Sequence, residues 1–282
     1  MTVSTEASSF GAAGDVEARR GWRAQAALEQ ELVLPAGSTT VSCSAPLGTG
    51  GLGRHLQELL DALQRCEQPS VEQSSVCISG GERTDAGRTG LLAKLLELPL
   101  PLSPAVRARA SAGEFDAYAA RQLGAADHLI AFNGQALRQL GAATRAGYRS
   151  RTLVSANSHM RRVIAQHERA LAQYPLEGSW ARHMLGRNLR EYERADRVLV
   201  ASRYIHESFL QEGFDERRLD WFPLTPDPRF DGARSAAPSS DRFEIVYVGS
   251  LAVHKGVPLL IDAVRRLAHP DIRLRLVGGW GT

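Results

Sequence analysis

Short apolar segments and amphipathic segments alternate along most of this 282-residue chain. The apolar segments have the length of buried strands, and leucines at helical spacing mark several of the segments between them. The clearest case is a glycine-rich stretch followed by a stripe of leucines on one helical face: Leu52, Leu56, Leu59, Leu60 and Leu63. This alternation predicts an α/β fold built on doubly wound parallel sheets.

The pattern gives a set of expected elements. Strands are expected at residues 39–45, 74–79, 127–132, 151–156, 197–201, 243–250 and 272–279. Helices are expected from the leucine stripe and at 91–98, 104–123, 135–146, 161–173, 179–195, after Ser202, and at 254–268. In the last helix the residues expected to face inward are Val257, Leu260, Val264 and Leu267.

Composition divides the chain into four parts. Residues 1–36 are rich in Ser, Ala, Gly and Glu and predict a flexible N-terminal extension. Residues 37–225 carry the first run of strands and helices, and the proline-rich residues 226–241 predict a hinge. Residues 242–282 restart the pattern with two strands and one helix, which cannot complete a core of their own. We therefore expect a truncated second domain, or a remnant that packs on the first.

The overall composition indicates a globular protein with a buried core, since 43% of the residues are hydrophobic and 23% are charged. No apolar run approaches the roughly 20 residues that cross a bilayer, and no signal peptide layout is present, so we expect a cytoplasmic protein. The net charge of +3 is too small to indicate nucleic acid as a partner. Cys43, Cys66 and Cys77 lack metal-ligand spacing, and no Asp-x-Asp motif occurs, so no metal is expected.

The charge is unevenly distributed along the chain. Between Arg138 and Arg197 twelve arginines stand against five acidic residues, a local excess of +7. Such an excess favours a phosphate-rich ligand, or peripheral contact with an anionic membrane surface at the inner face. A solvated helical face accounts for the same arginines, and both interpretations stay open.

The glycine-rich stretch, "PLGTGGLGRHL" at residues 46–56, lies between an expected strand and an expected helix. Gly48, Gly50 and Gly53 match the dinucleotide pattern G-x-G-x-x-G. A nicotinamide site also needs an acidic residue at the end of the second strand, but here that strand ends in "ISGG" and Glu82 comes later. A dinucleotide is therefore disfavoured. A structural turn stays open, although glycines at a helix start also leave backbone N–H groups bare for an anion or a hydroxyl.

A lysine near the second expected βα turn is another candidate for phosphate binding. Lys255 follows a buried strand and a Gly-Ser turn, where an ammonium can lie beside phosphate oxygens. Only Lys94 and Lys255 among 34 basic residues are lysines. Because a guanidinium does not readily replace an ammonium at a tight phosphate site, we expect a specific role for Lys255. Lys94 is expected on a solvated helix.

Several segments resemble one enzyme family when they are taken together and in order. They are "GTGGLGRHLQELLDAL", "ADHLIAFNG", "RTLVSANSH", "ADRVLVASRYIHESF", "IVYVGSLAVHKGVPLLIDAV" and "LRLVGG", which cover most of residues 38–282. This series resembles the retaining glycosyltransferases of the GT-B fold, of the family 4 or group 1 type. The resemblance implies two Rossmann-like domains, the second incomplete here. It also implies transfer of a sugar from a nucleotide-diphosphate donor to a hydroxyl acceptor, in the synthesis of polysaccharide, glycolipid or glycoconjugate. No cofactor besides the donor is implied.

The resemblance also implies roles for single residues in a cleft between the domains. Gly50 and Gly51 approach the donor phosphates or sugar, and Lys255 pairs with the diphosphate. Gly278 and Gly279 lie beside the nucleoside.

Three further positions carry the resemblance or depart from it. Gly249 and Ser250 form the turn after the strand, and Ser250 replaces an arginine that many members carry. His159 corresponds to a histidine that faces the reacting sugar in such enzymes, although it can equally be a loop residue or the first residue of a helix. The family's Glu-containing motif is expected beyond Thr282. Two alternatives therefore stay open, a non-catalytic nucleotide- or sugar-binding fragment and a nicotinamide-dependent oxidoreductase.

Overall fold

The computed structural model describes residues 37–65, 75–80, 104–225 and 242–280. The expected N-terminal extension, the expected helix 91–98 with Lys94, Cys66 and the expected hinge 226–241 lie outside the described residues. The boundaries proposed for the four parts therefore stay a prediction.

A six-stranded sheet forms the larger part of the molecule, and all of its paired strands run parallel. The strand order is β2-β1-β3-β4-β5-β6. The order reverses between β1 and β3, as it does in doubly wound sheets. The strands are β1 (Thr39–Cys43), β2 (Ser75–Ser79), β3 (His128–Phe132), β4 (Ser150–Ser155), β5 (Arg197–Val200) and β6 (Leu219–Trp221).

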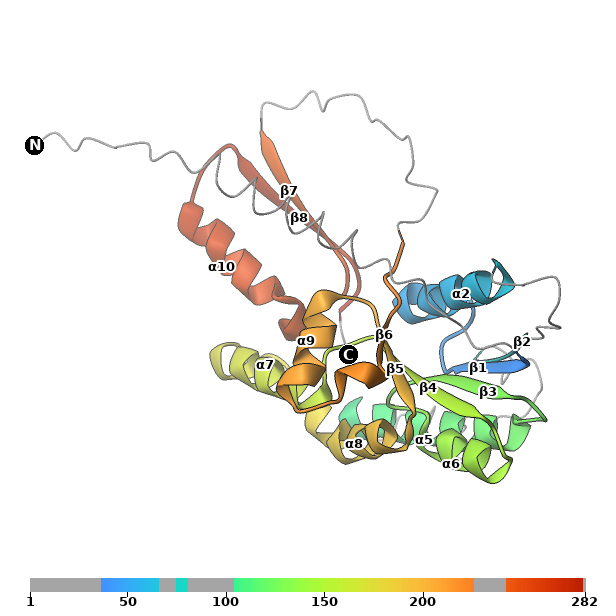
Figure 1. Cartoon of the computed structure of the whole chain (residues 1–282). Coiled ribbons are helices and arrows are strands. Elements are labelled where there is room, and N and C mark those ends of the chain that lie inside the picture. Colours follow the sequence, from blue (N-terminus) through green and yellow to red (C-terminus); the bar gives the residue numbers. More distant parts are fainter. Residues whose placement is uncertain (1–36, 66–74, 81–103, 226–241, 281–282) are drawn as a thin grey trace, which may run out of the picture.

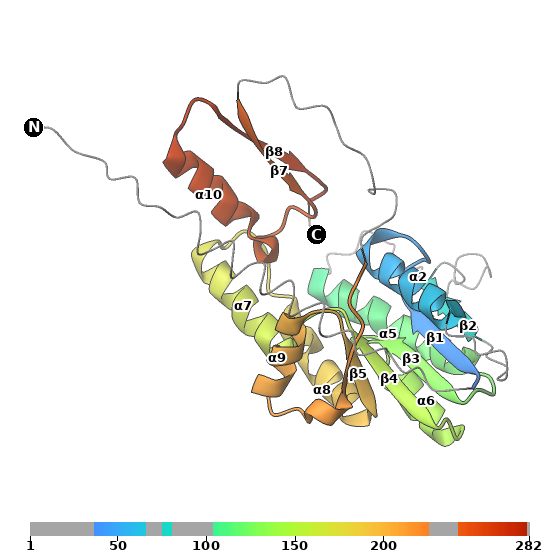
Figure 2. The same ribbon diagram turned by 45° about the horizontal axis from the view of Figure 1, so that its top comes forward.

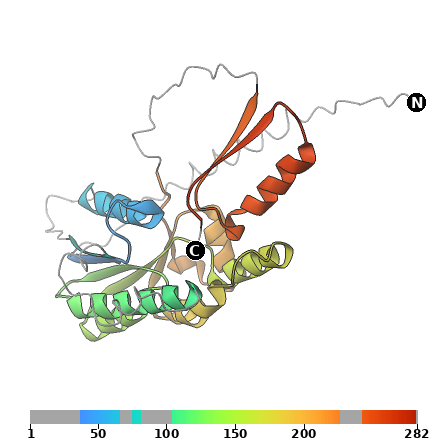
Figure 3. The same cartoon turned by 180° about the vertical axis from the view of Figure 1, so that it is seen from behind.

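Helices cover both faces of this sheet (Figure 1). Helix α2 lies on one face, and α5, α6 and α8 lie on the other, where α5 and α6 run side by side in the view from behind (Figure 3). The helices are α2 (Gly50–Arg65), α5 (Pro104–Gln122), α6 (Leu137–Arg145), α7 (Met160–Gln173), α8 (Leu185–Arg194) and α9 (Arg203–Gln211), with 3-10 turns η1 (Ala181–Met184) and η2 (Glu216–Arg218).

The core has two layers because successive side chains of a strand point to opposite faces of the sheet. Ile130 and Phe132 of β3 pack with the α2 leucines, which are largely buried as the stripe predicts. Leu129 of β3 points the other way and packs with Leu140 of α6. Strand β3 therefore buries apolar side chains on both faces, which is typical of parallel sheets covered by helices.

A second parallel pair follows residue 242. Strands β7 (Phe243–Val248) and β8 (Ile272–Val277) are joined by the turn η4 (Val253–Lys255) and helix α10 (Val257–Leu267). The expected α/β architecture with two parallel sheets is thus confirmed, and the second sheet has two strands among the described residues.

Three details differ from the sequence expectations. The helix expected from residue 254 begins at Val257, because Gly256 adopts a left-handed conformation with φ of +74° and separates η4 from α10. Leu267, expected to face inward, is 60% exposed, so that prediction is wrong. Burial decreases along α10, from Val257 in the first turn, which is buried, to Leu267 in the last. Strand β6 was not predicted, because three residues are too short for a periodic signal.

The second unit rests on α7 of the first (Figure 2). Val253 of η4 is buried at this junction, and its N–H donates to the carboxylate of Glu177 in the loop after α7. The hydroxyl of Tyr174 at the end of α7 donates to Asp262 of α10 at 2.7 Å. Two side chains from one short segment thus fix the second unit against the first, and Glu177 is the one that contacts the turn with Lys255.

Candidate functional site

The carboxyl ends of β1 and β3 form the part of the large sheet where a ligand is expected. The strand order reverses between these two strands, and ligands of doubly wound sheets bind at this point. The loop after β1 is the glycine-rich stretch, and the loop after β3 is residues 133–136. These two loops differ sharply in how their backbone N–H groups are used.

The glycine-rich loop ends in an open helix N-terminus. Gly50 and Gly51 begin α2 and are exposed, and a Cβ at either position would meet no atom within 4 Å. The first turn of α2 holds no acidic residue. Among the described residues, no acceptor faces the N–H groups of Gly50 and Gly51. The first N–H groups of a helix have no intrahelical partner, so this turn presents a positive end of the helix dipole to solvent.

Other glycines at this edge serve packing. A Cβ on Gly53 would lie 2.1 Å from the carbonyl oxygen of Pro46, so only glycine lets the loop fold back on its helix. A Cβ on Gly80, after β2, would lie 1.8 Å from the carbonyl oxygen of Ser44. The G-x-G-x-x-G spacing therefore reflects a tight turn at Gly53 and open backbone at Gly50, and neither observation requires a dinucleotide.

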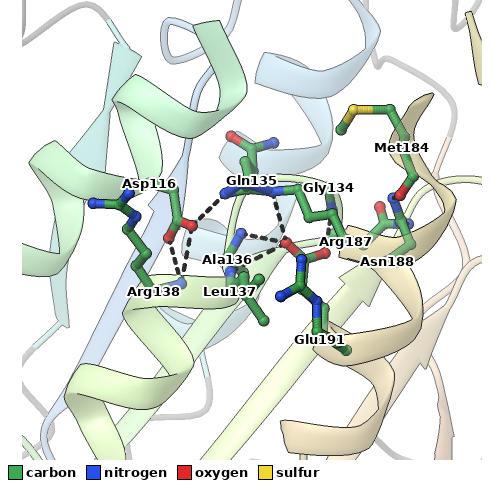
Figure 4. A network of polar contacts seen from close by, with 12 residues as sticks. Asp116, Gly134, Gln135, Ala136, Leu137, Arg138, Met184, Arg187, Asn188 and Glu191 are labelled. Atoms are coloured by element: carbon green, nitrogen blue, oxygen red, sulfur yellow. Dashed lines mark hydrogen bonds and ion pairs between the residues drawn. The ribbon is translucent and has the colours of Figure 1, made fainter. Parts of the chain in front are cut away.

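The loop after β3 is already occupied by carboxylates of the protein itself (Figure 4). Glu191 of α8 is completely buried, and its carboxylate accepts hydrogen bonds from the N–H groups of Gly134, Ala136 and Leu137. Asp116 of α5, also completely buried, accepts from the N–H groups at the start of α6. The N-terminus of α6 thus has no free donors for an external anion.

Arg187 joins the two carboxylates. Its guanidinium donates to Asp116 and lies 3.4 Å from Glu191, with Nε and Oε1 as the nearer atoms. Burial raises the pKa of Glu191 to about 7, although the N–H groups of Ala136 and Gly134 and the charge of Arg187 act to lower it. Sequence reasoning missed this network. Its only local signal is the i, i+4 spacing of Arg187 and Glu191, because Asp116 is 71 residues away.

His159 follows β4 and is the residue before α7, but its ring does not face solvent. The side chain is 5% exposed and packs against Tyr192 and Phe209, with ring centroids 4.9 and 5.1 Å away. Burial lowers the pKa of His159, so the neutral imidazole is favoured. Its backbone N–H donates to the hydroxyl of Ser208, which fixes the start of α7. These contacts favour the structural interpretation of His159, and its catalytic role stays a prediction.

The edge of the second sheet is formed by two glycine turns in contact. Gly249 follows β7 and Gly278 follows β8, with φ of +146° and +153°. A Cβ on Gly278 would lie 1.8 Å from the carbonyl oxygen of Gly249, so the contact depends on glycine. The N–H of Leu251 donates to the carbonyl of Gly279, and Ser250 is exposed beside them. These turns bring four of the predicted site residues to one edge: Gly249, Ser250, Gly278 and Gly279.

Lys255 ends the turn η4 directly after this edge. Its side chain is exposed, and it forms no ion pair with any carboxylate in the described part of the chain. The turn itself is held by hydrogen bonds from the N–H of Lys255 to Ala252 and from the N–H of Gly256 to Val253. An ammonium on a rigid turn, without an internal carboxylate partner, is available to an anionic ligand.

The structure therefore groups the predicted residues into two sets. Lys255 and the Gly249 and Gly278 turns belong to the edge of the second sheet, and Gly50 and Gly51 belong to the edge of the first. No cluster of three or more metal-binding side chains occurs among the described residues. None of the described helices has the length and apolar character needed to span a membrane.

Comparison with known proteins gives only distant similarities. No protein-family model matches the chain, and no curated protein sequence matches it. Among solved structures, the apo form of the lipopolysaccharide outer core galactosyltransferase WaaB shares 16% identity, covers 86% of this chain and 61% of its own, and has a TM-score of 0.43. The UDP co-structure of MnaA from S. aureus shares 12% identity, covers 85% of this chain and 61% of its own, and has a TM-score of 0.45. A UDP-glucosyltransferase from Polygonum tinctorium shares 14% identity, covers 87% of this chain and 66% of its own, and has a TM-score of 0.39.

The chain spans about three fifths of the length of the first of these proteins. All the TM-scores are below 0.5, so these similarities assign no family and no substrate to the chain.

Proposed function

We propose that this chain forms part of a glycosyltransferase that binds a nucleotide-diphosphate sugar and moves the sugar to a hydroxyl acceptor. The donor diphosphate lies at the edge of the second sheet, beside Lys255 and the Gly249 and Gly278 turns. The open N-terminus of α2, with Gly50 and Gly51, contributes backbone N–H groups from the first sheet. Transfer with retention of configuration, and a place in polysaccharide, glycolipid or glycoconjugate synthesis, rest on the sequence resemblance.

The observation that carries the proposal is the ammonium of Lys255, which forms no ion pair with a carboxylate of the described residues. A sugar transfer from such a donor needs stabilisation of the negative charge that develops on the departing diphosphate. An exposed ammonium on a fixed turn, next to two backbone turns that only glycine permits, supplies that charge without a metal ligand set. The loop after β3 is not available to bind the diphosphate, because Glu191 and Asp116 already accept from its N–H groups and from those at the start of α6.

The test is the affinity for nucleoside diphosphates, measured by calorimetry and by thermal shift with UDP, GDP, ADP and NAD. We expect binding of one nucleoside diphosphate and an about tenfold loss of affinity in Lys255→Ala, since one charge-assisted contact is removed. Arg273→Ala is the matched control, because Arg273 is an exposed cation of the same unit on β8. An equal loss in both variants, or no loss in Lys255→Ala, would refute the assignment of Lys255.

The same titration separates the proposal from its two rivals. A nicotinamide-dependent oxidoreductase predicts stabilisation by NAD and no response to UDP or GDP. A non-catalytic binding fragment predicts nucleotide binding without sugar transfer or donor hydrolysis. The open α2 N-terminus suits any phosphate, so the NAD arm of the experiment is essential.

Peripheral contact with an anionic membrane was proposed from the arginine excess. The structure leaves fewer of these arginines available for such a contact than the sequence indicates. Six of the twelve arginines form ion pairs with acidic residues in the described part of the chain. Four of those six use a partner outside residues 138–197: Arg149, Arg161, Arg187 and Arg197. Arg145 and Arg194 are exposed and converge over Gly141 without a carboxylate partner in the described part of the chain. Sedimentation with anionic and neutral liposomes tests this contact. Equal binding to both kinds of liposome would refute the proposed contact with an anionic membrane.

A further inference from the structure

A single carboxylate joins α7 to the turn η4 at the junction between the two units. Glu177 lies in the loop between α7 and η1. Its Oε1 lies 2.9 Å from Nε2 of His167 on α7, and its Oε2 accepts a hydrogen bond of 3.2 Å from the N–H of Val253. Nδ1 of His254 lies 3.8 Å from Oε1. Val253 and His254 are the two residues before Lys255, so this carboxylate contacts the turn that carries the proposed diphosphate ligand.

The contact is built to be rigid on the α7 side. The side chain of His167 is 1% exposed and lies against Trp180, with ring centroids 5.7 Å apart. A buried imidazole has few orientations, so it fixes the carboxylate it binds. The carboxylate in turn fixes the N–H of Val253, and the carbonyl of Val253 accepts from Gly256 at the end of the same turn. A chain of hydrogen bonds thus runs from the core of the first unit to the backbone around Lys255.

We propose that Glu177 is a positioning residue for the ligand site: it holds the Val253–Lys255 turn against α7 and so directs the Lys255 ammonium toward the bound diphosphate. The inference rests on the proposed function. It explains why a carboxylate lies close to this turn while Lys255 forms no ion pair with it, since the carboxylate is engaged by His167 and by the backbone. An ammonium paired with Glu177 would bind phosphate weakly. Because His167 and the N–H of Val253 bind the Glu177 carboxylate instead, the Lys255 ammonium keeps its charge available for phosphate.

The experiment measures the affinity for UDP, or for whichever nucleoside diphosphate binds, and for inorganic pyrophosphate as a probe that needs no base. Glu177→Ala is expected to weaken both by about tenfold, as Lys255→Ala does, while the affinity for the free nucleoside stays unchanged. Glu177→Gln is expected to remain close to the wild type. Its amide oxygen still accepts from Val253, and its amide group donates to the other tautomer of His167.

A double-mutant cycle distinguishes positioning from a general structural effect. If Glu177 acts through Lys255, the variant that combines Glu177→Ala with Lys255→Ala binds pyrophosphate no more weakly than Lys255→Ala alone. Tyr174→Phe is the matched control, because it removes one hydrogen bond across the same junction without touching the turn. It is expected to leave pyrophosphate affinity within about twofold of the wild type. Amide exchange at Val253 should rise in Glu177→Ala and stay slow in Tyr174→Phe.

The outcomes separate the two proposals. Additive losses in the double variant, or an unchanged affinity in Glu177→Ala, overturn the positioning role and leave the proposed function standing. A wild-type protein that binds neither pyrophosphate nor any nucleoside diphosphate overturns the proposed function, and the positioning role with it. A loss in Tyr174→Phe equal to that in Glu177→Ala also overturns the specific role of Glu177.

Discussion

At the scale of single residues, His55 shows how burial changes the chemistry of a side chain. It lies on α2, is 3% exposed, and packs between Phe132 and Phe222, and no described residue forms a hydrogen bond with its Nε2. Burial lowers the pKa of His55 to about 4 from an ordinary value of 6.5. The ring is therefore neutral near pH 7 in the folded protein.

This burial predicts an acid-dependent loss of stability. Between pH 6.5 and 4 the unfolded chain binds a proton at His55 and the folded chain does not, so the free energy of unfolding falls as the pH falls. A shift of this size corresponds to about 3 kcal/mol at most. His55→Leu should remove that part of the pH dependence in urea unfolding at pH 7 and pH 4.5. His183→Gln, at an exposed histidine, is the control, and equal slopes in His55→Leu and the wild type would contradict the prediction.

Gly51 offers a second test at this scale, because the space around it is open. Gly51→Ala meets no atom of the protein, and alanine favours a helix more than glycine does, so the variant should be at least as stable as the wild type. A methyl group there covers the bare N–H groups, so nucleoside diphosphate affinity should fall by about tenfold. Gly186→Ala, an equally open glycine inside α8, should leave affinity unchanged. If both variants bind the nucleoside diphosphate as tightly as the wild type does, the N-terminus of α2 is not part of the site.

At the scale of elements, the start of α6 depends on side chains that belong to other helices. Glu191 of α8 accepts hydrogen bonds from three backbone N–H groups at this helix start. The N-cap residue is Ala136, whose side chain cannot accept a hydrogen bond. Glu191→Ala leaves those buried donors without their acceptor and removes one of the two carboxylates beside Arg187, which keeps its hydrogen bond to Asp116. We expect a loss of about 3–5 kcal/mol in the free energy of unfolding. Glu193→Ala, on the exposed side of the same helix, should change it by less than about 0.5 kcal/mol in chemical denaturation.

The same elements show what the sequence can and cannot predict. The leucine stripe of α2 and the apolar runs of β1, β3 and β4 are periodic, so both the elements and their buried faces follow from the pattern. The carboxylates at the start of α6 do not, because Asp116 and Glu191 come from separate helices and meet only after the sheet has formed. The family resemblance alone suggested His159 as a site residue. Its packing against Tyr192 and Phe209 is a tertiary property that the sequence pattern does not show.

At the scale of the whole molecule, the central question is whether one ligand engages both sheets. The glycine turn at Gly50 and the turn at Lys255 belong to different units, and the contacts that join those units run through α7 and η4. A ligand confined to the second unit explains an effect of Lys255 but no effect of Gly51. A ligand that bridges the units requires both.

Hydrogen exchange measured by mass spectrometry with a saturating nucleoside diphosphate decides between these arrangements. A bridging ligand should slow amide exchange in residues 48–53 and in residues 249–256 together, because each segment places backbone donors or a cation at the edge of its sheet. Lys255→Ala should then reduce the protection of both segments at a fixed ligand concentration. Protection of residues 249–256 alone would place the diphosphate on the second unit. The glycine-rich loop would then serve only to turn the chain from β1 into α2.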